Sequence, residues 1–264
     1  MRIVIPSINR WNSQPTLAAI PPFWHVTLVV PEVQSSLYAR YANTSDNTRP
    51  HTYIAEHPMT FTNIGEVRHW ILERFRGEHV LMMDDDLAFF RRRHDEPDKF
   101  KDSTFEDMDK LLEDCMGRLH EYAHIAVATR EGGNRVTSKY NHVTRGLRVL
   151  GYNTNVVLNT NTEFNRIPVM EDFDVTLQLL RKGYANCIIN WMVHNQVGGS
   201  GATGGCSTYR TLDMQAKAAH KLAELHPDFV TVVKKKTKTA WGGAERTDVR
   251  IQWKKAYESS GRNP

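Results

Sequence analysis

Three consecutive aspartates, Asp84–Asp86, directly follow the apolar run 79–83. Carboxylates this close together repel one another, and the repulsion grows at the end of a buried strand, where little water screens it. A hard divalent cation removes this penalty, and Mg²⁺ or Mn²⁺ would bring in phosphate oxygens as further ligands. The triplet therefore predicts a metal-phosphate site, although a solvated acidic loop would carry the same residues.

Glu171 and Asp172 form a second acidic pair, 85 residues or more along the chain. The dipole of a helix favours carboxylates in its first turn, so the pair also fits a plain acidic helix start. Near a metal site, either carboxylate becomes a candidate general base, which removes the proton of an acceptor hydroxyl. We expect Asp172 in that role, with Glu171 as the second candidate.

His194 closes the apolar run 188–193, and a glycine-rich segment follows at 198–205. A histidine in this position is either a hydrogen-bonded strand-end residue or a metal ligand. The glycine-rich segment could close over a diphosphate and offer backbone N–H groups, with Gly199 and Ser200 as candidate donor-binding residues. It could equally be a linker, and it is not a Walker A loop because no Gly-Lys-Ser/Thr follows.

Two cations, Arg10 and Arg68, lie near the same predicted strand ends. Either could pair with a pyrophosphate or contact a nucleobase, and either could be an ordinary surface arginine. Arg68 lies on the helix that leads into the Asp84–Asp86 strand, which favours its placement at the site.

A largely parallel sheet would bring these residues together. Short apolar runs predict strands at 2–6, 25–31, 52–56, 79–83, 123–129 and 187–194. Apolar residues at helical spacing predict helices over 64–75, 103–119, 171–182 and 211–225. The segment 149–159 predicts a strand pair or hairpin. A helix between two strands favours a right-handed parallel connection, and ligands bind at the carboxyl ends of such strands.

Composition restricts the class of protein. The chain has 264 residues, 40% hydrophobic and 24% charged, which is typical of an ordinary soluble protein, and a single α/β domain of this length is common. No run approaches the length of a membrane span, and the first residues fit a strand better than a signal peptide. Three separated cysteines argue for free thiols in a reducing compartment, so we expect a cytoplasmic protein. The sequence does not reveal the oligomeric state.

Positive charge is concentrated at the end of the chain. Residues 231–264 hold nine Lys/Arg and three Asp/Glu, whereas the rest holds 25 Lys/Arg and 27 Asp/Glu. We therefore expect a domain over 1–230 and a basic extension over 231–264. Basic residues interleaved with aromatics could contact nucleic acid, and the candidates are Lys234, Lys235, Lys236, Lys238 and Trp241. A solvated charged tail is the alternative.

In this order the motifs resemble those of GT-A glycosyltransferases with a family-2-like layout. The matching segments are Ile-Val-Ile-Pro-Ser at 3–7, Ile-Gly-Glu-Val-Arg at 64–68, Val-Leu-Met-Met-Asp-Asp-Asp at 80–86, Val-Met-Glu-Asp-Phe-Asp at 169–174 and Met-Val-His at 192–194. The resemblance covers about residues 1–205. It implies a GT-A (Rossmann-like) α/β fold, with a mixed, mainly parallel sheet flanked by helices.

The resemblance also implies roles for individual residues. Asp86 would bind the cation, with His194 and Asp84 as further ligands. The nucleotide-sugar donor, a UDP-sugar by this resemblance, would contact Pro6, Ser7, Arg10, Arg68, Asp84 and Asp85. The Glu171–Asp172 pair suggests inversion at the sugar. The Gln-x-x-Arg-Trp segment of family 2 is absent, which argues against processive polysaccharide synthesis.

A narrower resemblance is to phage TET-associated glycosyltransferases. It is carried by the opening Arg-Ile-Val-Ile-Pro-Ser, the Glu-Asp-Phe-Asp helix and the basic end. It implies that the acceptor is 5-hydroxymethylcytosine in phage DNA, modified in the host cytoplasm. Three alternatives stay open: a glycan, lipid or protein acceptor; a metal-dependent nucleotidyltransferase or nuclease; and a DNA-binding module without catalysis.

Overall fold

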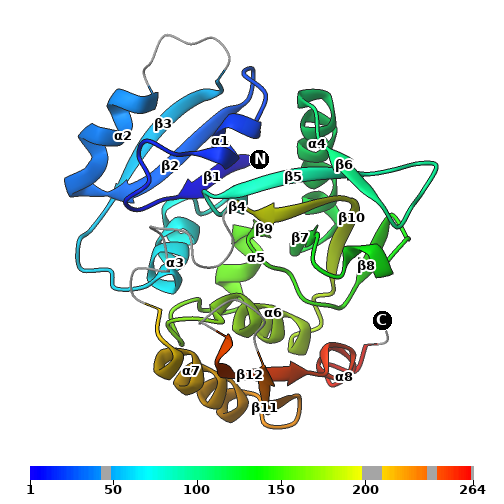
Figure 1. Cartoon of the computed structure of the whole chain (residues 1–264). Coiled ribbons are helices and arrows are strands. Elements are labelled where there is room, and N and C mark those ends of the chain that lie inside the picture. Colours follow the sequence, from blue (N-terminus) through cyan, green and yellow to red (C-terminus); the bar gives the residue numbers. More distant parts are fainter. Residues whose placement is uncertain (43–48, 198–209, 237–242, 263–264) are drawn as a thin grey trace.

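The computed structural model describes residues 1–42, 49–197, 210–236 and 243–262. Within them, ten strands form one mixed sheet, in the order β3-β2-β1-β4-β9-β7-β10-β5-β6 with β8 beside β10 (Figure 1). Its strands are β1 (Arg2–Pro6), β2 (His25–Pro31), β3 (His51–His57), β4 (His79–Met83), β5 (Leu87–Arg92), β6 (Phe100–Asp102), β7 (His124–Thr129), β8 (Tyr140–His142), β9 (Val149–Asn153) and β10 (Asn186–Gln196).

The first four strands are parallel, as predicted. Ile3 in β1 lies between Val26 of β2 and Leu81 of β4, and β3 extends the same arrangement. All four strands therefore end at the same edge of the sheet. The chain leaves the sheet at this edge after β1, at Ser7, and after β4, at Asp84. The edge therefore positions the acidic triplet.

Antiparallel pairing dominates the rest of the sheet. β9 runs antiparallel to β4 and β7, and β10 runs parallel to β7 but antiparallel to β5. The long β10 changes register between Ile189 and Val193, next to β7. Beyond this irregularity it continues to His194 and Gln196, which therefore reach the edge of the sheet where β5 begins.

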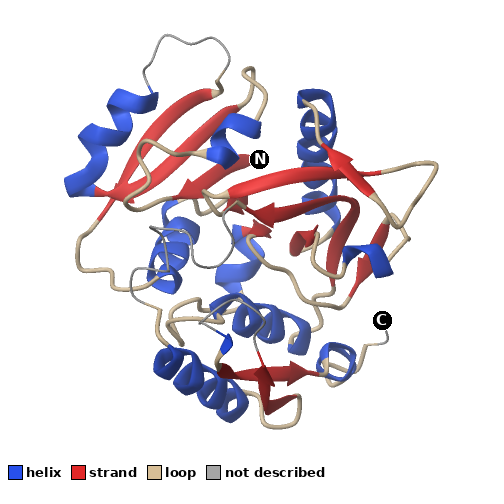
Figure 2. Cartoon of the chain, in the orientation of Figure 1, coloured by secondary structure: helices blue, strands red, loops and turns tan. Residues whose placement is uncertain are grey.

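Helices cover both faces of the sheet (Figure 2). They are α1 (Pro15–Ala19), α2 (Ser35–Ala42), α3 (Ile64–Arg74), α4 (Phe105–Glu121), α5 (Thr154–Asn159), α6 (Glu171–Arg181), α7 (Leu212–Leu225) and α8 (Trp253–Glu258), with short 3₁₀ turns η1 (Glu32–Gln34) and η2 (Gly133–Arg135). One apolar core joins the sheet to α1, α2 and α4, and another joins its opposite face to α3, α5 and α6.

Local sequence explains where the predicted helices begin. The Asn63 side chain accepts a hydrogen bond from Glu66 N, and the Glu66 side chain accepts one from Asn63 N, which completes a capping box on α3. Thr104 and Asp107 form the same arrangement on α4. Each box satisfies backbone N–H groups that the first turn of a helix cannot pair internally.

A third layer covers the outer side of α6. It consists of α7, the hairpin of β11 (Val230–Lys236) and β12 (Glu245–Ile251), and α8. Leu177 of α6, Leu222 of α7 and Val249 of β12 share one apolar cluster. The described part of 231–264 is therefore folded against the preceding domain, and a division of the chain at 230 stays a prediction.

A buried polar network also joins α6 to the end of α7. Asp174, fully buried in α6, contacts Nε2 of His226 at 2.7 Å and Arg166 through both carboxylate oxygens. Arg181 donates to Nδ1 of His226 at 3.1 Å. The network ties the third layer to α6 through His226, while Arg166 and Gln178, which precede or belong to α6, also hydrogen-bond to Asp174.

Part of the predicted secondary structure is wrong. The segment 149–159 is a strand followed by a helix, because the Asn153 side chain accepts from Val156 N and begins α5. The sequence patterns also missed the strands β5, β6 and β8. Within the described residues, Cys115 and Cys187 are buried free thiols, and none of the helices is long and apolar enough to cross a membrane.

Candidate active site

Asp85 and Asp86 are held by residues of the loop after β1. Ser7 donates to one Asp85 oxygen and Arg10 to the other, and the same Arg10 Nη1 lies 2.9 Å from Asp86 Oδ2. Burial raises the pKa of Asp85 to about 6, against the lowering effects of Ser7 and Arg10. The loop after β1 thus supplies the positive charge that allows the two aspartates to lie together.

Further polar side chains fix this arrangement. Tyr38 of α2 and Gln14 each hydrogen-bond to Ser7 Oγ at 2.8 Å. Thr16 donates to Asp84 O at 2.6 Å and accepts from Leu87 N, so it holds the turn of the triplet closed. These residues could not be predicted from sequence, because isolated polar residues far from the triplet in the chain carry no local signal.

Asp84 faces a different partner. Arg68, buried in α3, donates to Asp84 Oδ1 at 2.8 Å and to Glu171 Oε1 at 2.5 Å. Burial disfavours the arginine's charge, but the two carboxylates outweigh that effect and raise its pKa. Arg68 therefore links the acidic triplet after β4 to the head of α6, where its partner Glu171 lies 103 positions further along the chain than Arg68 itself.

Glu171 and Asp172 differ in their surroundings. Glu171 is buried against Arg68, and burial raises the pKa of its carboxyl to about 7. Asp172 is partly exposed, and its Oδ1 accepts from Phe173 N at 2.9 Å. Burial also raises the pKa of Asp172 above its ordinary value, against the positive charges of Arg68 and Arg210. Asp172 is thus the acid of the pair with a surface open to an acceptor.

His194 lies in β10, opposite Phe89 of β5, and is completely buried. Among the described residues, neither Asp86 Oδ1 nor a ring nitrogen of His194 makes a well-formed hydrogen bond, although the backbone of Ala128 interacts with the ring. Burial and the charge of Arg148 lower the pKa of His194 to about 3, so the ring is neutral and can ligate a metal.

The described residues give a partial set of ligands for a divalent cation. They contain no group of three or more His, Cys, Asp and Glu side chains arranged to hold a metal ion. Mg²⁺, however, is commonly bound by one or two carboxylates together with substrate phosphates. Asp86, with one unpaired buried oxygen, fits that requirement, whereas the predicted ligand Asp84 is paired with Arg68.

The remaining candidate residues are spread over the molecule. Pro6 ends β1 beside Ser7. Gly199, Ser200, Lys238 and Trp241 lie outside the described residues. Lys234, Lys235 and Lys236 belong to β11 in the third layer, away from the edge of the large sheet. The fold therefore brings the predicted acids together with Arg10 and Arg68. The lysines of the basic hairpin lie elsewhere.

Comparisons with known proteins agree with this fold. TarS 1–349 of S. aureus in complex with UDP matches with a TM-score of 0.50 and 12% identity, over 85% of this chain and 65% of that chain. The mannosyltransferase PcManGT from Pyrobaculum calidifontis, in complex with GDP-Man and Mn²⁺, matches with a TM-score of 0.52 and 12% identity, over 86% of this chain and 64% of that chain. This chain therefore spans less than two thirds of either structure.

The curated protein sequences contain no match. The family model of the TET-associated glycosyltransferases matches residues 1–205. This range includes β1, the acidic triplet, the head of α6 and His194. It therefore contains all the described residues of the candidate active site. The chain therefore belongs to the TET-associated glycosyltransferase family.

Proposed function

We propose that this enzyme transfers a sugar from a nucleoside diphosphate sugar to the hydroxymethyl group of 5-hydroxymethylcytosine in DNA. The observation that carries the proposal is the link from Asp84 through Arg68 to Glu171, beside Asp172. This link connects the end of β4, where the donor would bind, to Asp172, which is partly exposed. The charge of the neighbouring Glu171 is compensated by Arg68. Membership of the family supports DNA as the acceptor.

Asp172 acts as the general base in this reaction. It takes the proton of the acceptor hydroxyl while the hydroxyl oxygen attacks the anomeric carbon from the side opposite the diphosphate. The bond from that carbon to the diphosphate oxygen breaks, and the nucleoside diphosphate leaves with the bonding electrons. The products are an inverted sugar-cytosine linkage, a nucleoside diphosphate and a protonated Asp172.

The diphosphate of the donor would bind beside Arg10 and Asp86. Asp86, with the neutral His194, would hold Mn²⁺ or Mg²⁺ here, and the bound cation would stabilise the charge of the leaving diphosphate. Arg10 contacts both Asp85 and Asp86, so it keeps the two carboxylates compensated in their buried position. Ser7 orients Asp85 through a hydrogen bond from its hydroxyl.

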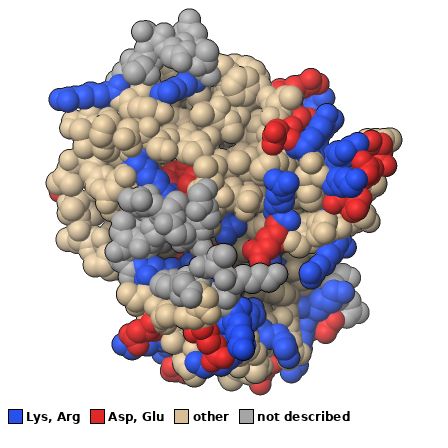
Figure 3. All heavy atoms as spheres, viewed as in Figure 1, with Lys and Arg blue, Asp and Glu red and all other residues tan. Residues whose placement is uncertain are grey.

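The basic hairpin supports a nucleic-acid acceptor. In the register of β11 and β12, Lys235, Arg246 and Arg250 share the face that points away from α7. Lys and Arg side chains are prominent on the lower right of Figure 3, over the region where the hairpin and α8 lie. Cations on one such face neutralise backbone phosphates without reading sequence.

The test combines a donor screen with product analysis. Thermal shift with Mn²⁺ identifies the nucleotide sugar that stabilises the protein, and mass spectrometry of hydroxymethylated DNA incubated with it reports the transferred mass. Asp86→Ala should remove metal-dependent donor binding, whereas Asp95→Ala, in an exposed turn, should retain it. Release of pyrophosphate, or cleavage of the DNA, would contradict sugar transfer.

A further inference from the structure

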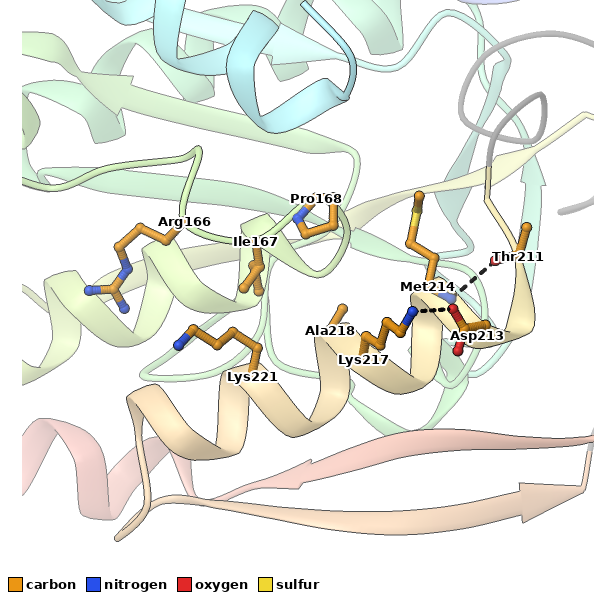
Figure 4. Close-up of a pocket in the computed structure, with 9 residues that line it drawn as sticks. All are labelled: Arg166, Ile167, Pro168, Thr211, Asp213, Met214, Lys217, Ala218 and Lys221. Carbon is orange, nitrogen blue, oxygen red and sulfur yellow. Dashed lines mark hydrogen bonds and ion pairs between the residues drawn. The ribbon is translucent and has the colours of Figure 1, made fainter.

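A cavity of about 330 Å³ lies between α7 and the turn that leads into α6 (Figure 4). Arg166 and Pro168 line it from the turn, and Met214, Lys217 and Lys221 line it from α7. Arg166 and Lys221 lie toward one end in the figure, and Met214 faces Pro168 toward the other. The cavity therefore combines an apolar wall with cations from two separate elements.

The turn that lines this cavity leads directly to the proposed base. Pro168 precedes Asp172 by four residues, so their Cα atoms are at most about 14 Å apart. At the other wall, Thr211 follows Arg210, whose charge acts on Asp172. An acceptor that places its hydroxyl at Asp172 has neighbouring groups within reach of the cavity.

The charges of the cavity suit an anion. Its lining has three cations against one acid, Asp213. Arg166 is fixed by two bonds to the buried Asp174, which use Nε and Nη2 and leave Nη1 outside that pairing. Rigid placement of a guanidinium favours phosphate binding, because little side-chain entropy is lost when the ligand arrives.

The two lysines are held only weakly by their present partners. Lys217 pairs with Asp213 at 2.7 Å and Lys221 with Glu224 at 2.9 Å, and the side chains of both pairs are about half exposed or more. Exposed ion pairs of this kind contribute little to stability, so a phosphate can replace the carboxylate partner. Both lysines are therefore available to a ligand.

We propose that this cavity binds the phosphodiester backbone of the acceptor strand, beside the nucleotide whose base enters the active site. This rests on the proposed function, and it names how the acceptor is held. None of the residues lining the cavity is aromatic, so it offers no platform for stacking a base or a sugar ring. Lysines and an arginine around an apolar wall fit phosphates and the deoxyribose between them.

The test uses Lys217→Ala/Lys221→Ala in the full chain and a duplex carrying one 5-hydroxymethylcytosine. Fluorescence anisotropy over a range of salt concentrations should show binding weakened about 10-fold and the salt slope reduced by about 1–2, since each lost phosphate contact removes about 0.9. Lys99→Ala/Lys110→Ala is a matched control, because both lysines are exposed and paired with an acid three or four residues away.

The outcomes separate this inference from the proposed function. Unchanged affinity and salt slope in the Lys217/Lys221 variant, with DNA glycosylated by the wild type, overturn the cavity assignment alone. If the wild type binds DNA through these lysines but transfers no sugar to it, the cavity assignment stands and the proposed function fails. If the wild type does not bind DNA, both are overturned.

Discussion

Arg68 lies between two carboxylates that come from different parts of the chain. Asp84 follows β4, Glu171 begins α6, and the guanidinium bonds to both in a buried position. Removal of one partner from a buried ion pair leaves an uncompensated charge, which is far more destabilising than loss of an exposed pair. Arg68 is therefore a positioning residue for both sides of the site.

Replacement of Arg68 should reveal this role in the stability of the fold. Arg68→Met is expected to lower the free energy of unfolding by about 3–5 kcal/mol, because Glu171 and Asp84 lose their counter-charge. Arg68→Met/Glu171→Gln should regain part of the loss, because one of the two orphaned charges is gone. Urea denaturation of the single and double variants measures the coupling, and strictly additive effects would argue against a direct ion pair.

Asp172 should control the rate and its pH dependence. Asp172→Asn is expected to lower kcat about 10²–10⁴-fold, the range in which a general base contributes. In the wild type, burial raises the pKa of Asp172, so its base form is lost at a higher pH than for an ordinary aspartate. The acid limb of the kcat/KM profile should therefore lie above the ordinary value of 3.8.

The matched control for Asp172 is Glu163→Gln, an exposed acid before α6. It should keep both the rate and the acid limb. An Asp172→Asn variant that kept the wild-type kcat would remove the residue from catalysis. Sequence reasoning found Asp172 because acids at a helix start are a local pattern, but it could not find that Arg68 neutralises Glu171, since that contact depends on the tertiary fold.

Elements with strong local signals were predicted well, and those made by distant pairing were not. The capping boxes at Asn63 and Thr104 begin helices close to where the sequence indicated. β5 was missed, because its six residues become a strand through antiparallel pairing with β10, about 100 positions later. Asn153 was read as part of a hairpin, although a side-chain cap begins a helix there.

At Gly65, α3 packs closely against the backbone of Phe164. A Cβ built at this position would lie 2.6 Å from the backbone oxygen of Phe164, which cannot move aside as a side chain could. Gly65→Ala should therefore lower the free energy of unfolding by about 1–3 kcal/mol, as overpacking does. Thermal unfolding compared with the wild type measures the loss.

Gly117 in α4 provides the opposite control, because a Cβ there meets nothing within 4 Å. Gly117→Ala should raise the free energy of unfolding by about 1 kcal/mol, since alanine is the better helix former. Equal effects of the two substitutions would show that the contact between Gly65 and Phe164 does not restrict α3. The difference between the variants isolates packing from helix propensity.

At the scale of the whole molecule, α6 is shared by two packing layers. Val175 and Leu179 face the core beneath the sheet, whereas Leu177 faces the cluster with α7 and the hairpin. Truncation near residue 230 would expose that cluster and destabilise the protein. A loss of DNA binding in the truncated protein could then come from unfolding as well as from the lost basic residues. Charge variants on the outer face of the hairpin are the cleaner test of DNA contact.

Lys235→Ala/Arg250→Ala should weaken binding to duplex DNA and reduce its salt slope, without a change in Tm. Both side chains are exposed on the outer face of the hairpin, and Arg246 continues to pair with Asp248 when Lys235 is lost. Anisotropy titrations and thermal unfolding give the two readouts. A loss of Tm, or unchanged DNA affinity, would contradict a role of this face in acceptor binding.

The buried contact between Asp174 and His226 has a consequence for the diversity of such enzymes. Asp174 is two residues from the proposed base, and its partner comes from the end of the helix that lines the phosphate cavity. A foreign third layer would remove the contact with His226 but would leave Asp174 bonded to Arg166 and Gln178. Chimeras without a histidine at this position should therefore unfold at a lower Tm, and restoring the histidine should raise the Tm again.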